Sequence, residues 1–402
     1  MLEGIKIIEM ATYIAAPSAG GIMADWGADV VKIEPLSGCA MRHYYASAMT
    51  DDYPDNPISA LDNRGKRAIA INTSTPEGAD IVRELIADAD VFLTNVRPAQ
   101  LKQQGLDFDS LHTINPKMVY ASVTGFGLQG PEADKPGFDT AAFWAKSGFG
   151  WMMTPKGASP APLRTAAGDH ITGMATASGI LAALLKAQKS GKGTLVESSL
   201  IRTAAYAIGC DFGTYLRYDR IGRSRPRQES LVPINNFFMT KDEHWIFLNA
   251  RPNEPDWPQI IGALGLDHLA DDARFGTLRD RRRNGTALVA LFDEAFIQHN
   301  LAEWKQRLDA ADLIWSPVQS FAQAKDDPQM QAAGVFVDMP KREGGTYQNI
   351  ASPIRFGDDN TDPKGPLPEV GEHTMQVLKE LGYDESKCQK MLADGVIGQF
   401  EA

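Results

Sequence analysis

The chain has 402 residues, of which 43% are apolar and 23% charged, and these proportions are ordinary for a globular protein. At about 150 residues per domain, this length predicts two or three domains with a core that needs no disulfide or structural metal. The 51 acidic residues outnumber the 40 basic ones, and the formal charge of −11 disfavours nucleic acid and anionic membranes as main partners.

The cysteine pattern and the hydropathy predict a reducing, aqueous compartment. Cys39, Cys210 and Cys388 are odd in number and widely spaced, which is typical of free thiols under reducing conditions. No basic start followed by an apolar run opens the sequence, and no run approaches the ~20 apolar residues of a membrane span. We therefore expect a cytoplasmic protein, most simply an enzyme, with no membrane partner.

The first 125 residues alternate strand and helix patterns. Helical patterns occupy residues 17–26 and 75–87, and short apolar runs predict strands at 5–10, 29–34, 67–71, 90–95 and 118–123. Strands separated by segments of helical length favour parallel βαβ units. This half of the chain is therefore predicted to form an open α/β sheet.

The later patterns differ. A long helix is predicted over 171–187, then a strand at 194–197 and a helix at 198–208, before an arginine-rich polar stretch near 215–232 that we interpret as a linker. A hairpin turning at 241–243 and several helices follow, and the chain is rich in turns after about residue 323. The final predicted element is a helix at 374–381. These patterns indicate a second, smaller α+β domain.

Several familiar motifs are missing. The first strand leads into Ala15-Ala16-Pro17-Ser18-Ala19-Gly20-Gly21, which lacks the Gly-x-Gly-x-x-Gly spacing of dinucleotide sites. No P-loop, Cys-x-x-Cys pair or Gly-x-Ser-x-Gly elbow occurs, and the seven histidines are not spaced as metal ligands. The residues alone therefore indicate an α/β enzyme without a metal site and without a nicotinamide cofactor.

A set of motifs, taken together, resembles one family. In chain order they are Leu2-Glu3-Gly4-Ile5-Lys6, Ala16-Pro17, Asp25-Trp26-Gly27-Ala28-Asp29-Val30-Val31-Lys32-Ile33-Glu34, Asn63-Arg64-Gly65-Lys66-Arg67, Thr75-Pro76-Glu77-Gly78, Asn95-Val96-Arg97-Pro98, Thr124-Gly125-Phe126-Gly127, Gly191-Lys192-Gly193 and Gly371-Glu372-His373. Their order over essentially the whole chain resembles that of the class III CoA-transferases, a family that includes formyl-CoA transferase, carnitine CoA-transferase and the α-methylacyl-CoA racemases.

The resemblance implies an architecture. It implies a Rossmann-like large domain of residues 1–215 and 325–402, a smaller α+β domain of residues 233–324 inserted between these two segments, and a linker at 216–232. It also implies a homodimer of two interlocked, ring-like chains. The linker and the turn-rich return that the sequence patterns indicate fall at the same places.

The resemblance further implies where coenzyme A binds. Tyr13, Ile14 and Ala15 are expected near the pantetheine. Ile71, Asn72, Thr73 and Ser74, with Asn95, Val96 and Arg97, are expected around the nucleotide, where Arg97 would neutralise a phosphate. Gly137, Phe138 and Asp139 are placed at the same site. Relatives carry an arginine just before the glycine that matches Gly105, where this chain has Lys102, Gln103 and Gln104, so the sequence leaves open whether Lys102 makes the second phosphate contact.

The choice between transferase and racemase depends on one position. The racemases have histidine at the second place of a Gly-His-Asp motif, because racemisation needs an acid and a base on opposite faces of the substrate. Here the motif is Gly137-Phe138-Asp139, and phenylalanine transfers no proton. The resemblance therefore favours CoA transfer from an acyl-CoA to a free carboxylic acid, with acyl-CoA as substrate and no tightly bound cofactor. Racemase-type α-proton chemistry and a non-catalytic acyl-CoA-binding protein are the alternatives.

Asp169 is the predicted catalytic residue. The resemblance implies that its carboxylate attacks a thioester and receives CoA as an aspartyl thioester. The sequence places it just before a helix expected to begin near Ile171, whose positive end would keep the carboxylate ionised. The alternative is that Asp169 serves only as the helix N-cap. His170 is interpreted as a structural residue. The segment 142–149, with Phe143 and Trp144, is similar to the subgroup that acts on 2-hydroxy acids, so a hydrophobic or 2-hydroxy acid is the expected acceptor.

Overall fold

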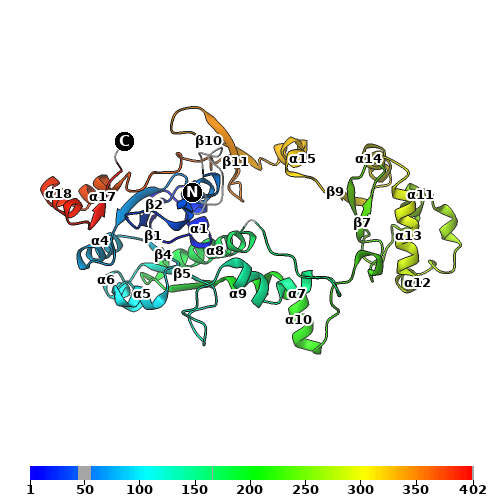
Figure 1. The fold of residues 1–402 in the computed structure, drawn as a ribbon, viewed down its shortest axis with the longest axis horizontal. Coiled ribbons are helices and arrows are strands. Elements are labelled where there is room, and N and C mark those ends of the chain that lie inside the picture. The colour runs from blue at the N-terminus through cyan, green and yellow to red at the C-terminus, as the bar shows by residue number, and fades with distance from the viewer. Residues whose placement is uncertain (44–55, 165, 401–402) are drawn as a thin grey trace. The chain divides into compact units, whose positions relative to one another are not determined.

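The computed structural model describes residues 1–43, 56–164 and 166–400, which divide into two compact units (Figure 1). Unit 1 contains Met1–Gly150, Ala161–Ile221 and Gln331–Ala402, and unit 2 contains Trp151–Pro160 and Gly222–Met330. Within the described residues, no helix combines the length and the apolar character needed to cross a membrane.

Unit 1 is built on a seven-stranded sheet with the order β12-β3-β2-β1-β4-β5-β6. Its strands are β1 Lys6–Met10, β2 Asp29–Glu34, β3 Arg67–Ile71, β4 Val91–Thr94, β5 Val119–Thr124, β6 Leu195–Ser199 and β12 Ile397–Gly398. The first six are parallel, as the alternating patterns predict, whereas β12 pairs antiparallel with β3. The predicted α/β sheet is therefore confirmed, with an antiparallel edge strand that was not expected.

Both faces of this sheet are buried. Ile8 of β1 and Phe92 of β4 belong to one apolar cluster, and their neighbours Ile7 and Leu93 belong to the other, because successive side chains of a strand point to opposite faces. The first cluster includes residues of α4 Pro76–Ala87, α6 Phe108–Ile114, α17 Thr374–Glu380 and α18 Glu385–Ala393. The second includes residues of α1 Ala15–Asp25, α8 Ala167–Ser190, α9 Leu200–Ala207 and the π-helix Thr140–Lys146. Burial on both faces explains why the strands are continuous apolar runs.

The remaining elements of unit 1 include several that sequence patterns did not predict. They are α3 Pro57–Asn63, α5 Pro98–Gln103, α10 Gly209–Tyr218 and the antiparallel hairpin of β10 Phe336–Pro340 and β11 Thr346–Ile350. The last turns of α10 reach into the stretch expected to be a linker. The hairpin, α18 and β12 lie in the segment expected to be turns ending in a single helix, so that expectation was incomplete.

Unit 2 has a core of its own around a three-stranded antiparallel sheet. Its strands are β7 Asn236–Met239, β8 Trp245–Asn249 and β9 Ile314–Pro317, and its helices are α11 Trp257–Leu264, α12 Leu278–Arg283, α13 Gly285–Phe296, α14 Leu301–Ala310 and α15 Phe321–Asp326. Short helices α7 Phe149–Met153 and α16 Pro328–Ala332 span the unit boundaries. The pairing of β7 with β8 confirms the predicted hairpin. Phe238, Phe292 and Trp304 are completely buried in this core.

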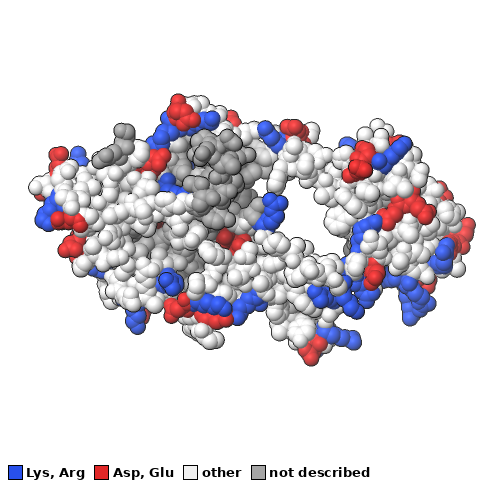
Figure 2. Space-filling view, in the orientation of Figure 1, with Lys and Arg blue, Asp and Glu red and all other residues white. Residues whose placement is uncertain are grey.

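On the face that Figure 2 shows, acidic and basic side chains lie scattered among uncharged ones. Several of the charged side chains that lie within unit 1 are instead buried, among them Glu9, Lys32 and Arg64. Glu9 and Lys32 form an ion pair near the carboxyl end of β1, where the candidate site is found, whereas Arg64 pairs with Asp25, the last residue of α1.

Candidate active site

A cleft of about 300 Å³ lies along the carboxyl ends of the parallel strands of unit 1. The residues that line it come from the segments that follow β1, β4 and β5 and from the starts of α8 and α9: Thr12, Tyr13, Ala15, Asn95, Val96, Arg97, Pro98, Gln100, Val123, Thr124, Gly125, Ala133, Lys135, Pro136, Gly137, Phe138, Asp169 and Leu200. Strand order reverses between β1 and β4, and open α/β sheets bind ligands at such a point.

The segments after β1 and β4 are tied together by two reciprocal hydrogen bonds. The Thr12 N–H donates to Asn95 Oδ1 at 2.9 Å, and Asn95 Nδ2 donates to the Thr12 carbonyl at 2.7 Å. The next residue, Tyr13, has a φ of 61°, in the left-handed region that bulky residues rarely adopt. Its ring meets the exposed Phe138 edge to face, with the centroids 4.9 Å apart. Together these contacts shape one wall of the cleft.

Asp169 lies in the first turn of α8 and lines the cleft. The helix begins at Ala167, one turn earlier than the expected start near Ile171, and its N-cap is Ala166, which has a φ of 52° and no side-chain cap bond. The predicted helix start is therefore wrong, and the alternative role of Asp169 as N-cap does not hold, because Asp169 is inside the helix. Gly168 precedes it because a Cβ there would lie only 2.6 Å from Cγ of the buried Phe143.

The electrostatics of Asp169 differ from the expectation as well. Burial, and next the negative charge of Asp139, raise the pKa of Asp169 to about 7, while His170 acts in the opposite direction. The positive end of α8 was expected to keep this carboxylate ionised, whereas its burial favours the neutral form. Perturbed carboxyl groups in clefts are candidates for catalysis, which makes Asp169 the candidate catalytic residue of this site.

Two neighbours surround Asp169 without lining the cleft. Asp139 is buried; burial raises its pKa, while hydrogen bonds from the Thr140 and Gly168 backbone oppose that rise. Its Oδ2 has no hydrogen-bond partner among the described residues. On the other side, His170 Nε2 lies 3.1 Å from Oδ1 of the buried Asp62. Burial lowers the pKa of His170, but the contact with Asp62 more than compensates, so that its pKa is raised.

The structure brings part of the predicted CoA contacts into the cleft. Tyr13, Ala15, Asn95, Val96, Arg97, Gly137 and Phe138 line it, together with Asp169. Other predicted residues lie elsewhere in unit 1: Ile14 is buried before α1, Ile71 ends β3, Asn72, Thr73 and Ser74 follow that strand, and Lys102 and Gln103 are exposed on α5. Thr73 Oγ1 accepts a hydrogen bond from Gln104 Nε2 at 3.3 Å, which joins two of these segments.

Sequence reasoning missed Lys135, which lines the cleft and provides a second cation besides Arg97. Its Nζ lies 3.1 Å from Glu132 Oε1 and 5.4 Å from the ring centroid of Phe126. The signal was present in Lys135-Pro136-Gly137, because this segment directly precedes the motif residues Phe138 and Asp139. Two cations in one cleft suit an anionic ligand such as a phosphate.

Comparisons with known proteins identify a family. The family model described as CoA-transferase family III matches residues 2–374. The chain is 34% identical to (R)-2-hydroxy-4-methylpentanoate CoA-transferase of Clostridioides difficile, over 99% of both chains. It is 32% identical to cinnamoyl-CoA:phenyllactate CoA-transferase of Clostridium sporogenes, over 98% of this chain and 96% of that one. The crystal structure of a CaiB/BaiF family protein from Brucella suis has a TM-score of 0.83 at 28% identity, covering 94% of this chain and 98% of the other.

These matches span nearly the full length of the chain, and they agree with the resemblance that the sequence motifs carry. The protein from Brucella suis resembles this chain in fold as well as in sequence. The chain therefore belongs to CoA-transferase family III and is an enzyme of that class.

Proposed function

We propose that the enzyme moves CoA from an acyl-CoA donor to a free carboxylic acid through a covalent intermediate on Asp169. The observation that carries the proposal is the position of this carboxyl group, in a cleft at the carboxyl ends of β1, β4 and β5 that also holds Arg97 and Lys135. The two cations suit the phosphates of CoA, and the carboxylate suits attack on its thioester.

The steps balance without any other reactant. An Asp169 carboxylate oxygen attacks the thioester carbonyl, and the C–S bond breaks. CoA is expelled as thiolate, and the acyl group is left on Asp169 as a mixed anhydride. The thiolate then attacks Cγ of Asp169, which releases the donor acid as a carboxylate and leaves an aspartyl-CoA thioester. The acceptor carboxylate repeats the sequence in reverse and leaves with CoA. Each step exchanges one anion for another, so no proton must move.

The raised pKa of Asp169 suits this role. A carboxylate with a pKa of about 7 is a more basic nucleophile than an ordinary one, and a substantial fraction of it is ionised near neutral pH. Once acylated, the group is neutral, and the repulsion from Asp139 that raises its pKa is relieved. The site therefore favours the acylated state relative to the free carboxylate.

We further propose a hydrophobic or 2-hydroxy acid as acceptor. Support comes from the two relatives named for 2-hydroxy-4-methylpentanoate and phenyllactate. The residues that first suggested it do not supply the pocket: Phe143 is buried beneath Gly168, and Trp144 packs on Phe149 with the ring centroids 5.4 Å apart. The exposed apolar ring in the cleft is instead Phe138, which Tyr13 holds on edge.

The test combines an acceptor panel with trapping of the intermediate. Acetyl-CoA and succinyl-CoA serve as donors, and acceptors include 2-hydroxy-4-methylpentanoate, phenyllactate, succinate, oxalate and carnitine. Incubation with acyl-CoA followed by hydroxylamine or borohydride should label the peptide that carries Asp169, and Asp169→Asn should abolish both labelling and turnover. Succinate, oxalate or carnitine as much the best acceptor would refute the acceptor assignment. Exchange of α-protons that is faster than CoA transfer would instead favour racemase chemistry.

The quaternary and domain arrangements are proposed on separate grounds. We propose that the chain forms an interlocked homodimer in which the 233–324 segment is an inserted domain and 216–232 a linker. The dimer is supported by α10, a helix that has no buried residue, and by Tyr206 and Leu216, which are 88% and 76% exposed. A helix with apolar side chains and no covered face fits a partner surface.

A further inference from the structure

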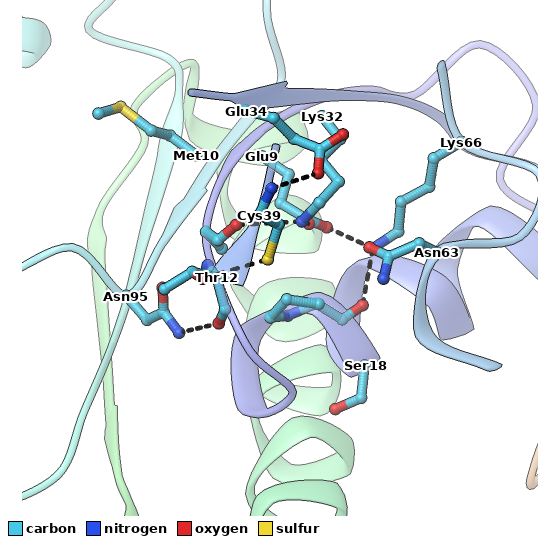
Figure 3. A network of polar contacts seen from close by, with 12 residues as sticks. Glu9, Met10, Thr12, Ser18, Lys32, Glu34, Cys39, Asn63, Lys66 and Asn95 are labelled. Atoms are coloured by element: carbon cyan, nitrogen blue, oxygen red, sulfur yellow. Dashed lines mark hydrogen bonds and ion pairs between the residues drawn. The ribbon is translucent and has the colours of Figure 1, made fainter. Parts of the chain in front are cut away.

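Three charged side chains near the end of β1 form a buried network (Figure 3). Glu9 Oε1 lies 2.7 Å from Lys32 Nζ, and its Oε2 lies 2.7 Å from Lys66 Nζ. Glu9 and Lys32 are at most 1% exposed and Lys66 is 3% exposed. One carboxylate is therefore the shared counterion of two ammonium groups, which come from the neighbouring strand β2 and from the segment just before β3.

Each ammonium group also holds a backbone carbonyl of the segment that follows β1. Lys32 Nζ donates to the Ala11 carbonyl at 3.0 Å, and Lys66 Nζ donates to the Pro17 carbonyl at 2.8 Å. These two carbonyls flank residues 12–16, the turn after β1 together with the first two residues of α1, which we call the Tyr13 loop. The loop provides Thr12, Tyr13 and Ala15 to the cleft. Both of its ends are thus fixed by the same three buried charges.

The Tyr13 loop needs such support because its backbone is strained. Tyr13 has a φ of 61°, and bulky residues in such conformations persist only where the surroundings determine them. Thr12 contributes through its bonds with Asn95, and its Oγ1 lies 3.1 Å from Cys39 Sγ (Figure 3). The Ser18 N–H and hydroxyl bond the carbonyls of Ile14 and Ala15, and the two lysines add a donor to the carbonyl on each side of the segment.

The network is an expensive way to stabilise a core. Moving charged groups out of water costs several kcal/mol for each ion, and well-packed apolar residues of similar volume are often as stable or more so. The Glu9 carboxylate also needs a glycine at position 20 of α1, because a Cβ there would lie 2.0 Å from Glu9 Oε2. What apolar side chains cannot supply is a donor to the carbonyls of Ala11 and Pro17.

We propose that Lys32 and Lys66 are positioning residues, which hold the Tyr13 loop in the strained conformation that forms the acyl-CoA wall of the cleft. Glu9 keeps both lysines in place as their common counterion. The kinetic part of this inference rests on the proposed function, because it takes the cleft to bind acyl-CoA; the structural part does not. Neither lysine lines the cleft, so each acts through the loop.

The experiment compares Lys32→Met, Lys66→Met and the triple variant Glu9→Met/Lys32→Met/Lys66→Met with the parent enzyme. Arg281→Met is the matched control, because Arg281 Nε forms a buried ion pair with Glu254 Oε2 at 2.6 Å within unit 2. Hydrogen exchange without substrate is measured for a peptide covering residues 11–17 and normalised to one covering β4. KM for acyl-CoA and kcat are measured on the same preparations.

The single variants should lose thermal stability, and exchange at 11–17 and KM for acyl-CoA should each rise about tenfold, the order expected when a strained loop is released. In the triple variant, thermal stability should recover because no charge is left unpaired. Its exchange and KM should nevertheless stay raised, since the lysine donors to both carbonyls are still missing. The control should lose stability with neither readout of the Tyr13 loop changed.

A triple variant with parent-like stability, exchange and KM would overturn the proposal, because the lysines would then serve folding alone. The same conclusion follows if Arg281→Met changes the Tyr13 loop as much as the lysine variants do. If the parent transfers no CoA to any acid, the proposed function fails. The exchange data, which need no substrate, then still decide whether the lysines hold the loop.

Discussion

The charges around Asp169 predict how the rate of CoA transfer depends on pH. The parent rate of CoA transfer should rise with pH through a midpoint near 7, because only the ionised carboxylate attacks. Asp139→Asn removes a negative neighbour and should lower this midpoint, whereas His170→Gln removes a positive one and should raise it. The measurement is kcat/KM for acyl-CoA between pH 5 and pH 9, and shifts in the same direction for both variants would contradict this electrostatic account.

The same pKa has a consequence for stability. Unfolding returns the carboxyl group of Asp169 to the ordinary range near 4, so between pH 4 and about 7 the folded state binds more protons than the unfolded one. Its contribution to stability is therefore present at low pH and is lost as pH rises through about 7. Asp169→Asn, which never ionises, should gain thermal stability relative to the parent as pH rises from 5 to 8. A pH-independent difference in Tm would show that Asp169 is not buried as described.

For single residues, the sequence predicts which side chains form the site better than it predicts what surrounds them. The pair Gly168-Asp169 is visible in the sequence, and the structure places Asp169 in the cleft. Its helix position and pKa could not be predicted, because the left-handed Ala166 and the nearby Asp139 depend on tertiary contacts. Lys135 was missed because a surface lysine has no pattern of its own until the chain folds.

At the scale of elements, the position of Asp169 depends on how closely α8 approaches α1. One turn along α8, a Cβ on Gly173 would lie 2.0 Å from Ser18 Oγ of α1 and 3.0 Å from the Ala15 carbonyl. Gly173→Ala should therefore push the helices apart, lower Tm and reduce kcat, because Asp169 moves with α8.

A second substitution separates crowding from helix propensity. Ser18→Ala removes the atom that the new methyl group meets first, so Gly173→Ala/Ser18→Ala should recover part of both the lost Tm and the lost kcat. Gly262→Ala is the control, since it lies in α11, where a Cβ would have ordinary contact with Asp267 Oδ1 at 3.6 Å, and it should be neutral or slightly stabilising. Equal losses in the single and double variants would show that crowding against Ser18 is not the cause.

An element can be predicted from the sequence when it buries enough apolar surface to leave a pattern. Strands β1 to β5 of the large sheet are buried on both faces and were found within one or two residues, as was β6, which is buried only at its end. β12 has only two residues, α18 buries only Cys388 and Met391, and β10 and β11 are mostly partly exposed, so none gives a periodic apolar signal. These elements form because the sheet or a partner strand is already there to receive them.

For the whole molecule, the proposed interlocked dimer predicts that dilution does not separate the chains. Chains threaded through one another separate only by unfolding, so the mass from light scattering should stay that of two chains at the lowest measurable concentration. Tyr206→Ser and Leu216→Ser, which reduce the exposed apolar area near α10, should lower Tm without producing a folded monomer. A monomer that appears reversibly on dilution would contradict threading, although not dimerisation.

The antiparallel pairing of β12 with β3 also determines when the large sheet can be completed during translation. Ile71 pairs with Ile397, so β3 leaves the ribosome long before the strand that covers its outer edge. When residue 330 has been added, unit 2 is fully translated, whereas β12 has not yet been made and the sheet of unit 1 still exposes the unpaired N–H and C=O groups of β3. The nascent enzyme thus passes through a stage in which its smaller unit is whole and its larger one is open to mispairing, and chaperone demand should be greatest there.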